Sequence, residues 1–373
     1  MWHLARKLLF HDRVKFLIAG AGVSVSVFLV LVQVGLYFGF MENASNLIDH
    51  AHADIWVAGV GNENFDLAGR TDERAFYRVL ETQGVAHAER MVLAWGQMKM
   101  PSGGSQGVEI VGIERGAQLF RPWNIIDGDD SRISEIDGVI VDHSEFPKLH
   151  MNGVGDRREV SGLSARVVAL TDGIRSFTTS PFLFTNIQTA RAYNGYGPDS
   201  LTYILVRAVP GVDMVELKAR LNRLPALEAF TAREFSGRAR TYWSERTGVG
   251  VGFFMTATMG LIVGMVIVGQ ILYNATLDHS REYGTMKAMG AENVTVMRVV
   301  LYQALISAAV GVTAGVPMAF GMSRALRLAN LNVLLYPWVV VVTVLGTAVM
   351  CAIAALIPML KIIRLDPALV FKG

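Results

Sequence analysis

Two short patterns in the first half of the chain contain residue types that support catalysis or metal binding in other proteins. Gly103, Ser105 and Gly107 have the Gly-x-Ser-x-Gly spacing of a hydrolase nucleophile. That motif requires a strand before the serine and a helix after it, because the sharp turn between them exposes the hydroxyl. Here a β-like run, residues 108–113, follows instead. We therefore interpret the glycines as a hairpin turn and expect no catalytic residue in the chain.

The second pattern is a pair of histidines. His50 and His52 are separated by one residue, and Asp49 and Asp54 lie close to them in the sequence. Imidazole and carboxylate groups are common metal ligands, but the solvated face of a stalk is the interpretation we favour. The sequence also has no Gly-x-x-x-x-Gly-Lys-Ser/Thr motif, whose backbone would cradle a phosphate. We expect no metal site and no cofactor in this chain, and any ATP-driven activity must use another subunit.

Charge is distributed unevenly along the 373 residues. The chain has 34 Lys+Arg and 32 Asp+Glu, a net charge of +2, and 18% charged residues, against about 25% in soluble proteins. Four segments contain no charged residue at all: 16–40, 247–277, 299–323 and 328–360. Each exceeds the roughly 20 apolar residues that cross a bilayer as a helix, so we predict four transmembrane helices, TM1 to TM4. The single cysteine, Cys351, excludes an intramolecular disulfide and a Cys-rich metal site.

Basic residues predict the orientation, because the cytoplasmic flanks of membrane helices are enriched in Lys and Arg. Residues 1–15, 278–298 and 361–373 fall on one side of a four-helix topology and together carry ten basic residues. The opposite short loop, residues 324–327, carries two. We therefore expect both termini in the cytoplasm and residues 41–246 in the extracytoplasmic space. The net charge is too small to indicate nucleic-acid binding.

The extracytoplasmic segment, residues 41–246, is long enough for a folded domain and has a mixed α/β pattern. Its flanks, residues 41–52 and 231–245, are expected to continue TM1 and TM2 as a helical stalk. Alternating apolar residues predict strands at 54–58, 108–113, 138–142, 166–170 and 201–207. Helical periodicity predicts helices at 72–83 and 213–224.

No acidic or basic residue interrupts the four predicted spans. Ion-coupled transporters usually need intramembrane carboxylates or histidines, so their absence from the spans counts against that mechanism. Gly260 with Gly264, and Gly311 with Gly315, are small-x-x-x-small pairs. Such pairs let two membrane helices approach closely, and we predict that these four glycines serve helix packing.

Residues 1–15 interleave apolar with basic side chains ahead of TM1. Among them, Trp2, Leu8 and Phe10 alternate with Arg6 and Lys7. This composition is typical of an amphipathic helix that lies on the cytoplasmic leaflet, and we predict such a cytoplasmic interfacial helix here. A disordered basic tail is the alternative.

The cytoplasmic segment 278–298 contains the most informative pattern. Good helix formers precede Gly290, which has the position of a helix C-cap. Charged residues in this short helix stand beside Tyr283, Met286 and Met289. An amphipathic helix at a membrane surface suits docking into a groove on a partner protein, although a plain connecting helix would have a similar pattern.

Residues 282–290, Glu-Tyr-Gly-Thr-Met-Lys-Ala-Met-Gly, resemble the coupling-helix signature of the FtsX/MacB-like ABC permeases, Glu-x-Gly/Ala-x-x-Lys-Ala-Met/Leu-Gly. Segments 269–273, 302–305 and 366–371 resemble the DevC-type exporter permeases more closely. The similarity runs through the whole chain in order. It is strong from residue 248 onward and diffuse in the extracytoplasmic segment.

The resemblance implies a fold and a set of coupling residues. The fold is an α-helical membrane protein with four transmembrane helices and a mixed α/β extracytoplasmic domain, the MacB-like periplasmic core domain, between helices one and two. The residues expected to contact an ATPase through the coupling helix are Arg281, Glu282, Tyr283, Met286, Lys287, Met289 and Gly290.

The resemblance also implies partners. Such permeases form homodimers, and each protomer binds a separate ABC ATPase subunit that hydrolyses ATP. DevC-type members resemble parts of tripartite efflux or lipid-export systems of the inner membrane, which work with a periplasmic adaptor (a membrane fusion protein), an outer-membrane channel and lipids. We therefore expect an exporter subunit that is not itself an enzyme, and mechanotransmission from the ATPase to the outer domain.

Two other functions stay open. An FtsX-like mechanotransmitter that regulates a cell-wall hydrolase would share the topology and the coupling helix, but the length of segment 41–246 favours the exporter. A sensory receptor would need a cytoplasmic output domain, and the predicted tail, residues 361–373, is too short for one.

Overall fold

The computed structural model describes residues 13–178, 180–328 and 331–363. The chain divides into two compact units, which we call the membrane unit (Met1–Gly39 and Val249–Gly373) and the outer unit (Phe40–Gly248). Most of the predicted interfacial helix, residues 1–12, lies outside the described residues, and so does the end of the predicted tail, residues 364–373.

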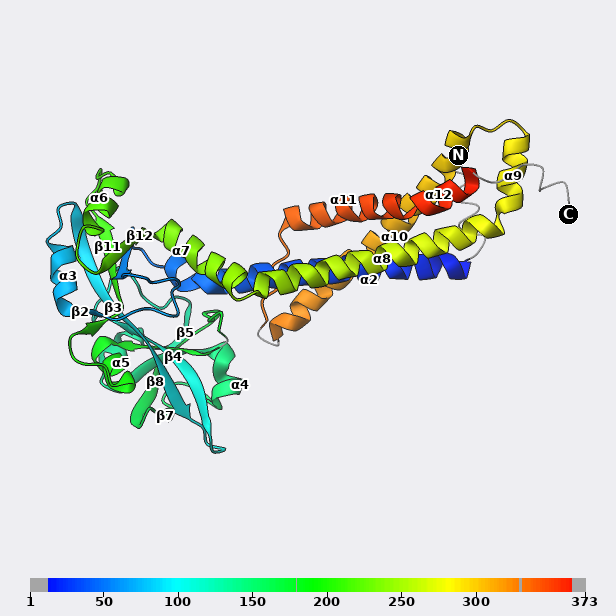
Figure 1. The fold of residues 1–373 in the computed structure, drawn as a ribbon. Helices are drawn as coiled ribbons and strands as arrows, with labels where there is room; N and C mark the ends of the chain where they lie inside the picture. The colour runs from blue at the N-terminus through cyan, green and yellow to red at the C-terminus, as the bar shows by residue number, and fades with distance from the viewer. Residues whose placement is uncertain (1–12, 179, 329–330, 364–373) are drawn as a thin grey trace. The chain divides into compact units, whose positions relative to one another are not determined.

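The membrane unit is helical. Among the described residues it contains most of α2, which continues into the outer unit, and five further helices, which Figure 1 labels. Their bounds are α2 (Arg13–Asp49), α8 (Val249–Asp278), α9 (Ser280–Ala288), α10 (Asn293–Leu328), α11 (Pro337–Ala354) and α12 (Leu356–Ile363).

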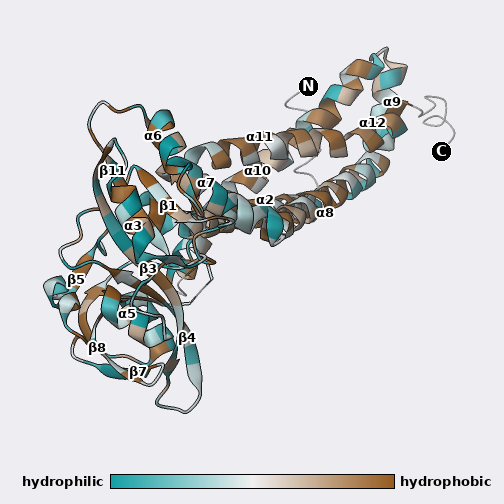
Figure 2. Cartoon of the chain, turned by 60° about the vertical axis from the view of Figure 1, so that its left-hand side comes forward, coloured by the Kyte–Doolittle hydropathy of each residue, from teal (hydrophilic) through white to brown (hydrophobic). Residues whose placement is uncertain are grey.

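Four helical segments are long and apolar enough to cross a membrane, and Figure 2 shows hydrophobic residues along α2, α8, α10 and α11. The segments are Val14–Asp49, Val249–Asp278, Asn293–Leu328 and Pro337–Ile363. The prediction of four transmembrane helices is confirmed.

The boundaries around the loop after TM3 were predicted wrongly. Residues 324–327, expected to form a short loop, belong to the last turns of α10. Arg324 and Arg327 mark where the helix becomes solvated rather than where it ends, because arginine is a good helix former and a cation suits a helix C-terminus. TM4 was predicted from residue 328, but its helix begins at Pro337, a favoured first helical residue.

The apolar residues just before Pro337 form a loop rather than a helix. The Leu334 amide donates to the Gly35 carbonyl at 3.0 Å, and Val333 is 1% exposed. A side chain on Gly39 would collide with the Asn332 backbone. Composition alone cannot separate such a buried loop from the start of a membrane helix.

The outer unit has a ten-stranded mixed sheet in the order β12-β1-β11-β3-β4-β9-β6-β8-β5, with β7 pairing with both β3 and β8. The β7 pairings close strands β3, β4, β9, β6, β8 and β7 into a ring, because β3 and β8 lie at opposite ends of that run. Pairs β4–β9 and β6–β8 are parallel. A separate small sheet joins β10 to β2.

The strands of the outer unit are β1 (Ile55–Gly59), β2 (Thr71–Asp72), β3 (Val85–Lys99), β4 (Ser105–Ile113), β5 (Ile125–Gly128), β6 (Gly138–Asp142), β7 (Arg157–Val160), β8 (Leu163–Thr171), β9 (Phe182–Asn186), β10 (Ser200–Leu201), β11 (Tyr203–Ala208) and β12 (Leu227–Thr231). Its helices are α3 (Glu73–Leu80), α4 (Phe146–Leu149), α5 (Ile187–Asn194), α6 (Met214–Leu221) and α7 (Ala232–Thr241), with short helical turns η1 (Asp130–Ser134), η2 (His143–Glu145) and η3 (Tyr242–Arg246). All five predicted strands and both predicted helices are present.

The sheet buries apolar residues on both faces, because alternate side chains of a strand point in opposite directions. In β1, Ile55 and Val57 join one core and Trp56 and Ala58 the other. Helices α3, α5 and α6 contribute to the first core, whereas α7 and the end of α2 contribute to the second. One face of the sheet is therefore covered by α7 and the end of α2, which are next to the membrane unit in the sequence.

The two stalk segments are helical, as predicted, and are bonded to each other within the outer unit. Arg240 on α7 donates to Asp49 at 2.6 Å and to Ser45 at 2.8 Å, and both acceptors lie in the last turns of α2. The Arg240–Asp49 pair is partly exposed, so it fixes geometry more than it stabilises the fold.

Candidate coupling site

The predicted cytoplasmic helix is present as α9. Gly290 follows it with φ +92°, a backbone conformation that glycine adopts without strain. The Gly290 amide donates to the Lys287 carbonyl and the Ala291 amide to the Met286 carbonyl, both at 3.0 Å. These bonds satisfy carbonyl groups that the end of a helix leaves free, so Gly290 ends α9 as the sequence indicated.

One face of α9 is fixed to the membrane unit. Tyr283 is 0% exposed and packs in the same apolar cluster as Val296 and Val299 of α10. The Lys287 ammonium donates to the backbone carbonyls of Ile362 at 3.2 Å and Ile363 at 3.0 Å, at the end of α12. A cation at a helix C-terminus is favoured by the helix dipole.

The opposite face of α9 is open to solvent. Its exposed residues are Arg281, Glu282, Thr285, Ala288 and Met289. Successive residues of an α-helix are about 100° apart, and this spacing places the five on a single arc of about 120°. We call this arc the open face of α9. Met289 is 76% exposed, which gives the open face an apolar contact beside its charges.

The structure therefore places only some of the seven predicted coupling residues on the open face. Arg281, Glu282 and Met289 lie on the open face. Tyr283 does not: as a fully buried side chain it cannot contact a partner, and its expected role in docking is corrected to one of anchoring. The remaining residues are Met286 and Lys287, which are half-buried, and Gly290, which ends the helix.

Tyr283 is held in an apolar environment outside the membrane spans. Its hydroxyl faces the buried Gln303 side chain of α10 but makes no hydrogen bond of normal geometry with the described residues. Burial raises the pKa of Tyr283 to about 12, because a phenolate loses its hydration in this site. The side chain is therefore neutral at physiological pH and acts through its volume.

The start of α2 approaches the α8–α9 junction. Lys15 forms an ion pair with Asp278, the last residue of α8. His279 lies within 3.2 Å of Glu282 on α9. These contacts place the N-terminal end of α2 beside α9, on the same side of the membrane unit.

The four predicted packing glycines all face α2. A Cβ on Gly264 would stand 2.6 Å from Ser26 Oγ, and one on Gly315 would stand 2.6 Å from the Ser24 carbonyl. Gly260 faces Leu29 and Gly311 faces Val23 in the same way. The structure thus places these glycines where α8 and α10 cross α2 within one protomer.

The Gly-x-Ser-x-Gly pattern and the histidine pair both lie in the outer unit. Ser105 begins β4, directly after the turn of the β3–β4 hairpin, and no helix follows it. His50 stacks on Trp123 with ring centroids 3.9 Å apart. Within residues 13–178, 180–328 and 331–363, no group of three or more His, Cys, Asp and Glu residues could hold a metal ion.

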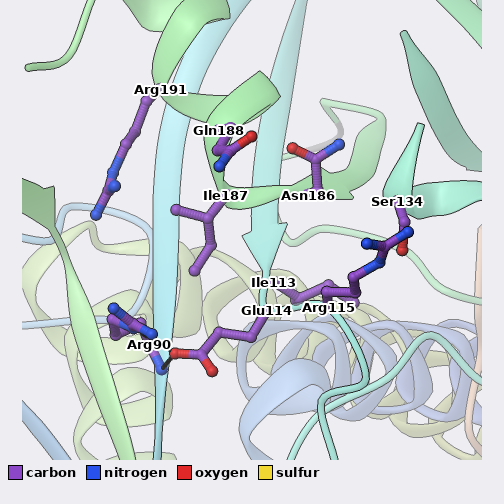
Figure 3. Close-up of a pocket in the computed structure, with 9 residues that line it drawn as sticks. All are labelled: Arg90, Ile113, Glu114, Arg115, Ser134, Asn186, Ile187, Gln188 and Arg191. Carbon is purple, nitrogen blue, oxygen red and sulfur yellow. Dashed lines mark hydrogen bonds and ion pairs between the residues drawn. The ribbon is translucent and has the colours of Figure 1, made fainter. Parts of the chain in front are cut away.

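The outer unit also contains a polar pocket of about 390 Å³ near the start of α5 (Figure 3). Ile113 and Ile187 form its apolar part. Arg90 forms ion pairs with Glu73 and Glu114, and Arg191 bonds to Glu73 at 3.1 Å. These carboxylates neutralise two of the lining arginines; the remaining lining residues are Arg115, Ser134, Asn186 and Gln188.

Comparison with known families agrees with this architecture. Residues 16–224 match the family described as MacB-like periplasmic core domain, and residues 254–367 match the FtsX-like permease C-terminal family. The second match includes α9, and the first covers more than half of the chain. The chain belongs to the MacB/FtsX-type ABC transporter permeases.

Similar proteins carry related names. This permease is 23% identical over 363 residues to an ABC transporter permease of Mycobacterium tuberculosis, covering 92% of each chain. It is 26% identical over 232 residues to the macrolide export ATP-binding/permease protein MacB of Escherichia coli O157:H7, covering 57% of this chain and 34% of MacB.

Two solved structures resemble the permease. The periplasmic region of MacB from Actinobacillus actinomycetemcomitans matches with a TM-score of 0.36 and 12% identity, covering 50% of this chain and 92% of that one. The extracellular domain of YknZ, a noncanonic ABC-type transporter from Gram-positive bacteria, matches with a TM-score of 0.37 and 11% identity, covering 48% of this chain and 99% of that one.

Proposed function

We propose that this permease is the membrane subunit of an ABC-type exporter and that the open face of α9 receives a separate ATPase subunit. The observation that carries the proposal is the division of α9 into two faces. Tyr283 and Lys287 fix one face to α10 and α12, whereas Arg281, Glu282 and Met289 are exposed on the other. A helix held in this way would transmit a displacement of its open face to α10 and α12.

The ATPase drives the permease only if it binds two permease conformations with different affinity. ATP and Mg are bound by the ATPase. The permease supplies the surface through which the closing motion of the ATPase is transmitted to the membrane helices. The contacts behind α9 determine how much of that motion reaches α10 and α12. Both termini and α9 are cytoplasmic in this proposal, and the outer unit faces the extracytoplasmic side of the inner membrane.

The finer expectations belong to the same proposal. A homodimer would present two open faces to two ATPase subunits. The outer unit would receive the motion through the two stalk segments, which the Arg240–Asp49 pair joins. A periplasmic adaptor and an outer-membrane channel would then complete a tripartite efflux or lipid-export system, with lipids around the spans.

Reconstitution with the cognate ATPase tests the proposal. Glu282→Arg should lower permease-dependent ATPase stimulation by about tenfold, the equivalent of about 1.4 kcal/mol, while membrane insertion is unchanged. Arg233→Glu is a matched charge reversal on an exposed residue of the outer unit, and stimulation should stay at the wild-type level. Equal stimulation by wild type and Glu282→Arg would reject the docking role of the open face.

Partner capture distinguishes the exporter from the FtsX-like regulator. Crosslinking through the outer unit in intact cells, followed by identification of the captured protein, should give a periplasmic adaptor. Capture of a cell-wall hydrolase instead would favour the regulator and reject the exporter, although the ATPase coupling would be common to both.

A further inference from the structure

Two acidic side chains are buried together inside the outer unit. Asp66, in the segment between β1 and β2, is 5% exposed, and Glu109, on β4, is 0% exposed. Trp95 Nε1 donates to the Asp66 carbonyl at 3.2 Å, and Trp95 is paired with Glu109 across β3 and β4. The two acidic residues are therefore neighbours, and the charge of Asp66 acts on Glu109. Among the described residues no lysine, arginine or histidine forms an ion pair with either carboxyl, so the pair has no balancing cation.

The hydrogen bonds leave one carboxyl oxygen unused. Trp243 Nε1 donates to Asp66 Oδ2 at 2.8 Å, and Ser176 Oγ donates to Glu109 Oε2 at 2.9 Å. Glu109 Oε1 is buried with no donor among the described residues. A buried oxygen without a donor is expensive for a carboxylate but natural for the O–H of a carboxylic acid that faces an acceptor.

Asp142 is another buried carboxyl group, and its hydrogen bonds can be compared with those of the pair. Asp142 is 0% exposed, and its two oxygens accept four bonds, from the Ser144 amide and hydroxyl, the Thr171 hydroxyl and the Ile174 amide. Asp66 and Glu109 together receive two side-chain donors. Each oxygen of Asp142 thus has two donors, whereas Glu109 Oε1 has none among the described residues.

We propose that Asp66 and Glu109 form a proton-binding site. In this site Glu109 Oε1 carries one proton, and the resulting O–H donates a hydrogen bond to the carboxylate of Asp66. Two carboxylates in contact in a buried site cannot both ionise at low cost. No atom other than the proton is gained or lost, and its source and acceptor is water. Burial raises the pKa of Glu109 well above its usual value, with the charge of Asp66 adding to the effect.

The neighbouring ionisable side chains that the structure describes do not supply a cation to the two carboxyl groups. Tyr203 is fully buried, and its hydroxyl donates to the Phe65 carbonyl at 2.7 Å; burial and the two carboxyls keep its pKa well above the usual value. Arg246 on η3 pairs with Glu63 at 3.6 Å, and both side chains are largely exposed. Arg175, beside Ser176, donates to Ser144 at 3.2 Å.

The site lies beneath the stalk segments of the outer unit. Trp243 belongs to η3, the last turn before the loop to α8, and stacks on Phe177 with centroids 4.3 Å apart. Phe177 in turn contacts Phe40 of α2 at 5.6 Å. If the proposed function is correct, loss of the proton would leave two like charges under Trp243 and loosen the stalk from the sheet as external pH rises.

Infrared spectroscopy of the full-length protein in nanodiscs tests the proton directly. Wild type at pH 7 should show the carbonyl stretch of a protonated carboxylic acid, and Glu109→Gln should lose that band. Asp142→Asn should keep it. A wild-type spectrum without a protonated carboxyl at pH 7, or an unchanged band in Glu109→Gln, would overturn the proposal.

Thermal unfolding across pH provides the second measurement. The wild-type midpoint should fall as pH rises from the ordinary pKa of a carboxyl group towards the raised pKa of the pair, and should level off where the band disappears. Glu109→Gln and Asp66→Asn should each lose this decline, and an unchanged decline in both would overturn the proposal. If neither variant folds, the wild-type infrared titration still decides. None of these measurements includes an ATPase, so failure of the coupling role would leave the proton site standing, and the reverse also holds.

Discussion

The Lys287 ammonium lies 3.0 Å from the backbone carbonyl of Ile363 and joins the cytoplasmic helix α9 to the end of α12. This bond and the buried Tyr283 side chain both attach α9 to the neighbouring helices α10 and α12. They give α9 one buried and one exposed face, which the proposed docking role requires.

Lys287→Met should weaken coupling without preventing ATPase binding. Methionine keeps the length and the apolar stem but removes the donors to Ile362 and Ile363, and hydrogen bonds to charged groups contribute about 1.5–3 kcal/mol. We expect stimulation of the ATPase to fall several-fold while the complex still forms in pull-down. Lys361→Met, at an exposed position of α12, is the matched control. If the variant lost both ATPase binding and ATPase stimulation, Lys287 would contact the ATPase directly, which would contradict this prediction.

Tyr283 should tolerate loss of its hydroxyl and not loss of its ring. Because the hydroxyl approaches Gln303 without a hydrogen bond of normal geometry, Tyr283→Phe should leave the thermal midpoint in detergent nearly unchanged. Tyr283→Ala should destabilise the membrane unit by about 3–5 kcal/mol through the cavity it leaves. If Phe were as damaging as Ala, the hydroxyl would have a partner in the working complex.

Gly264→Ala should destabilise the membrane unit, whereas Gly346→Ala should not. A Cβ on Gly264 would meet Ser26 Oγ at 2.6 Å, but one on Gly346 meets nothing within 4 Å. Overpacking typically destabilises by about 1–3 kcal/mol, and unfolding of both variants in detergent measures the difference. Dissociation of a dimer without a change in unfolding would contradict a role for Gly264 within the protomer.

The membrane spans could be predicted from the sequence because charge reports which solvent a segment meets. Their ends could not, since Arg324 and Arg327 are solvated while still helical and Val333 is buried without being helical. Gly290 marked the end of α9, because its positive φ depends on local backbone alone. Which face of α9 is buried depends on α10 and α12, so Tyr283 was assigned to the wrong face.

The long strand β3 shows a second limit. His87, Glu89 and Arg90 interrupt its apolar pattern, although Glu89 is buried and accepts from the Gln118 and Leu119 amides. The sequence around Glu109 does indicate an unusual residue, because Glu109 is a buried acid within the otherwise apolar end of β4. Its partner Asp66 is distant in sequence and could be found only from the fold.

The outer unit should lose stability in acid through Arg166. Asp137 has its pKa lowered by a hydrogen bond from Arg166, and Glu135 mainly by one from Arg132 with Arg166 adding to it. A lowered folded-state pKa contributes stability above the unfolded pKa that is lost as pH falls through the folded one. Arg166→Met should therefore lower the thermal midpoint at pH 7 and flatten its decline below about pH 5. An acid limb identical to that of wild type would contradict this assignment.

Cysteine labelling of the open face tests the central claim most directly. Cys351 is buried, so new surface cysteines can be labelled selectively with a bulky maleimide. We predict that the ATPase protects Met289→Cys and Arg281→Cys from labelling at least tenfold, and that it leaves Arg233→Cys in the outer unit unprotected. Equal labelling of Met289→Cys and Arg281→Cys with and without a bound ATPase would contradict the assignment of α9 as the coupling site.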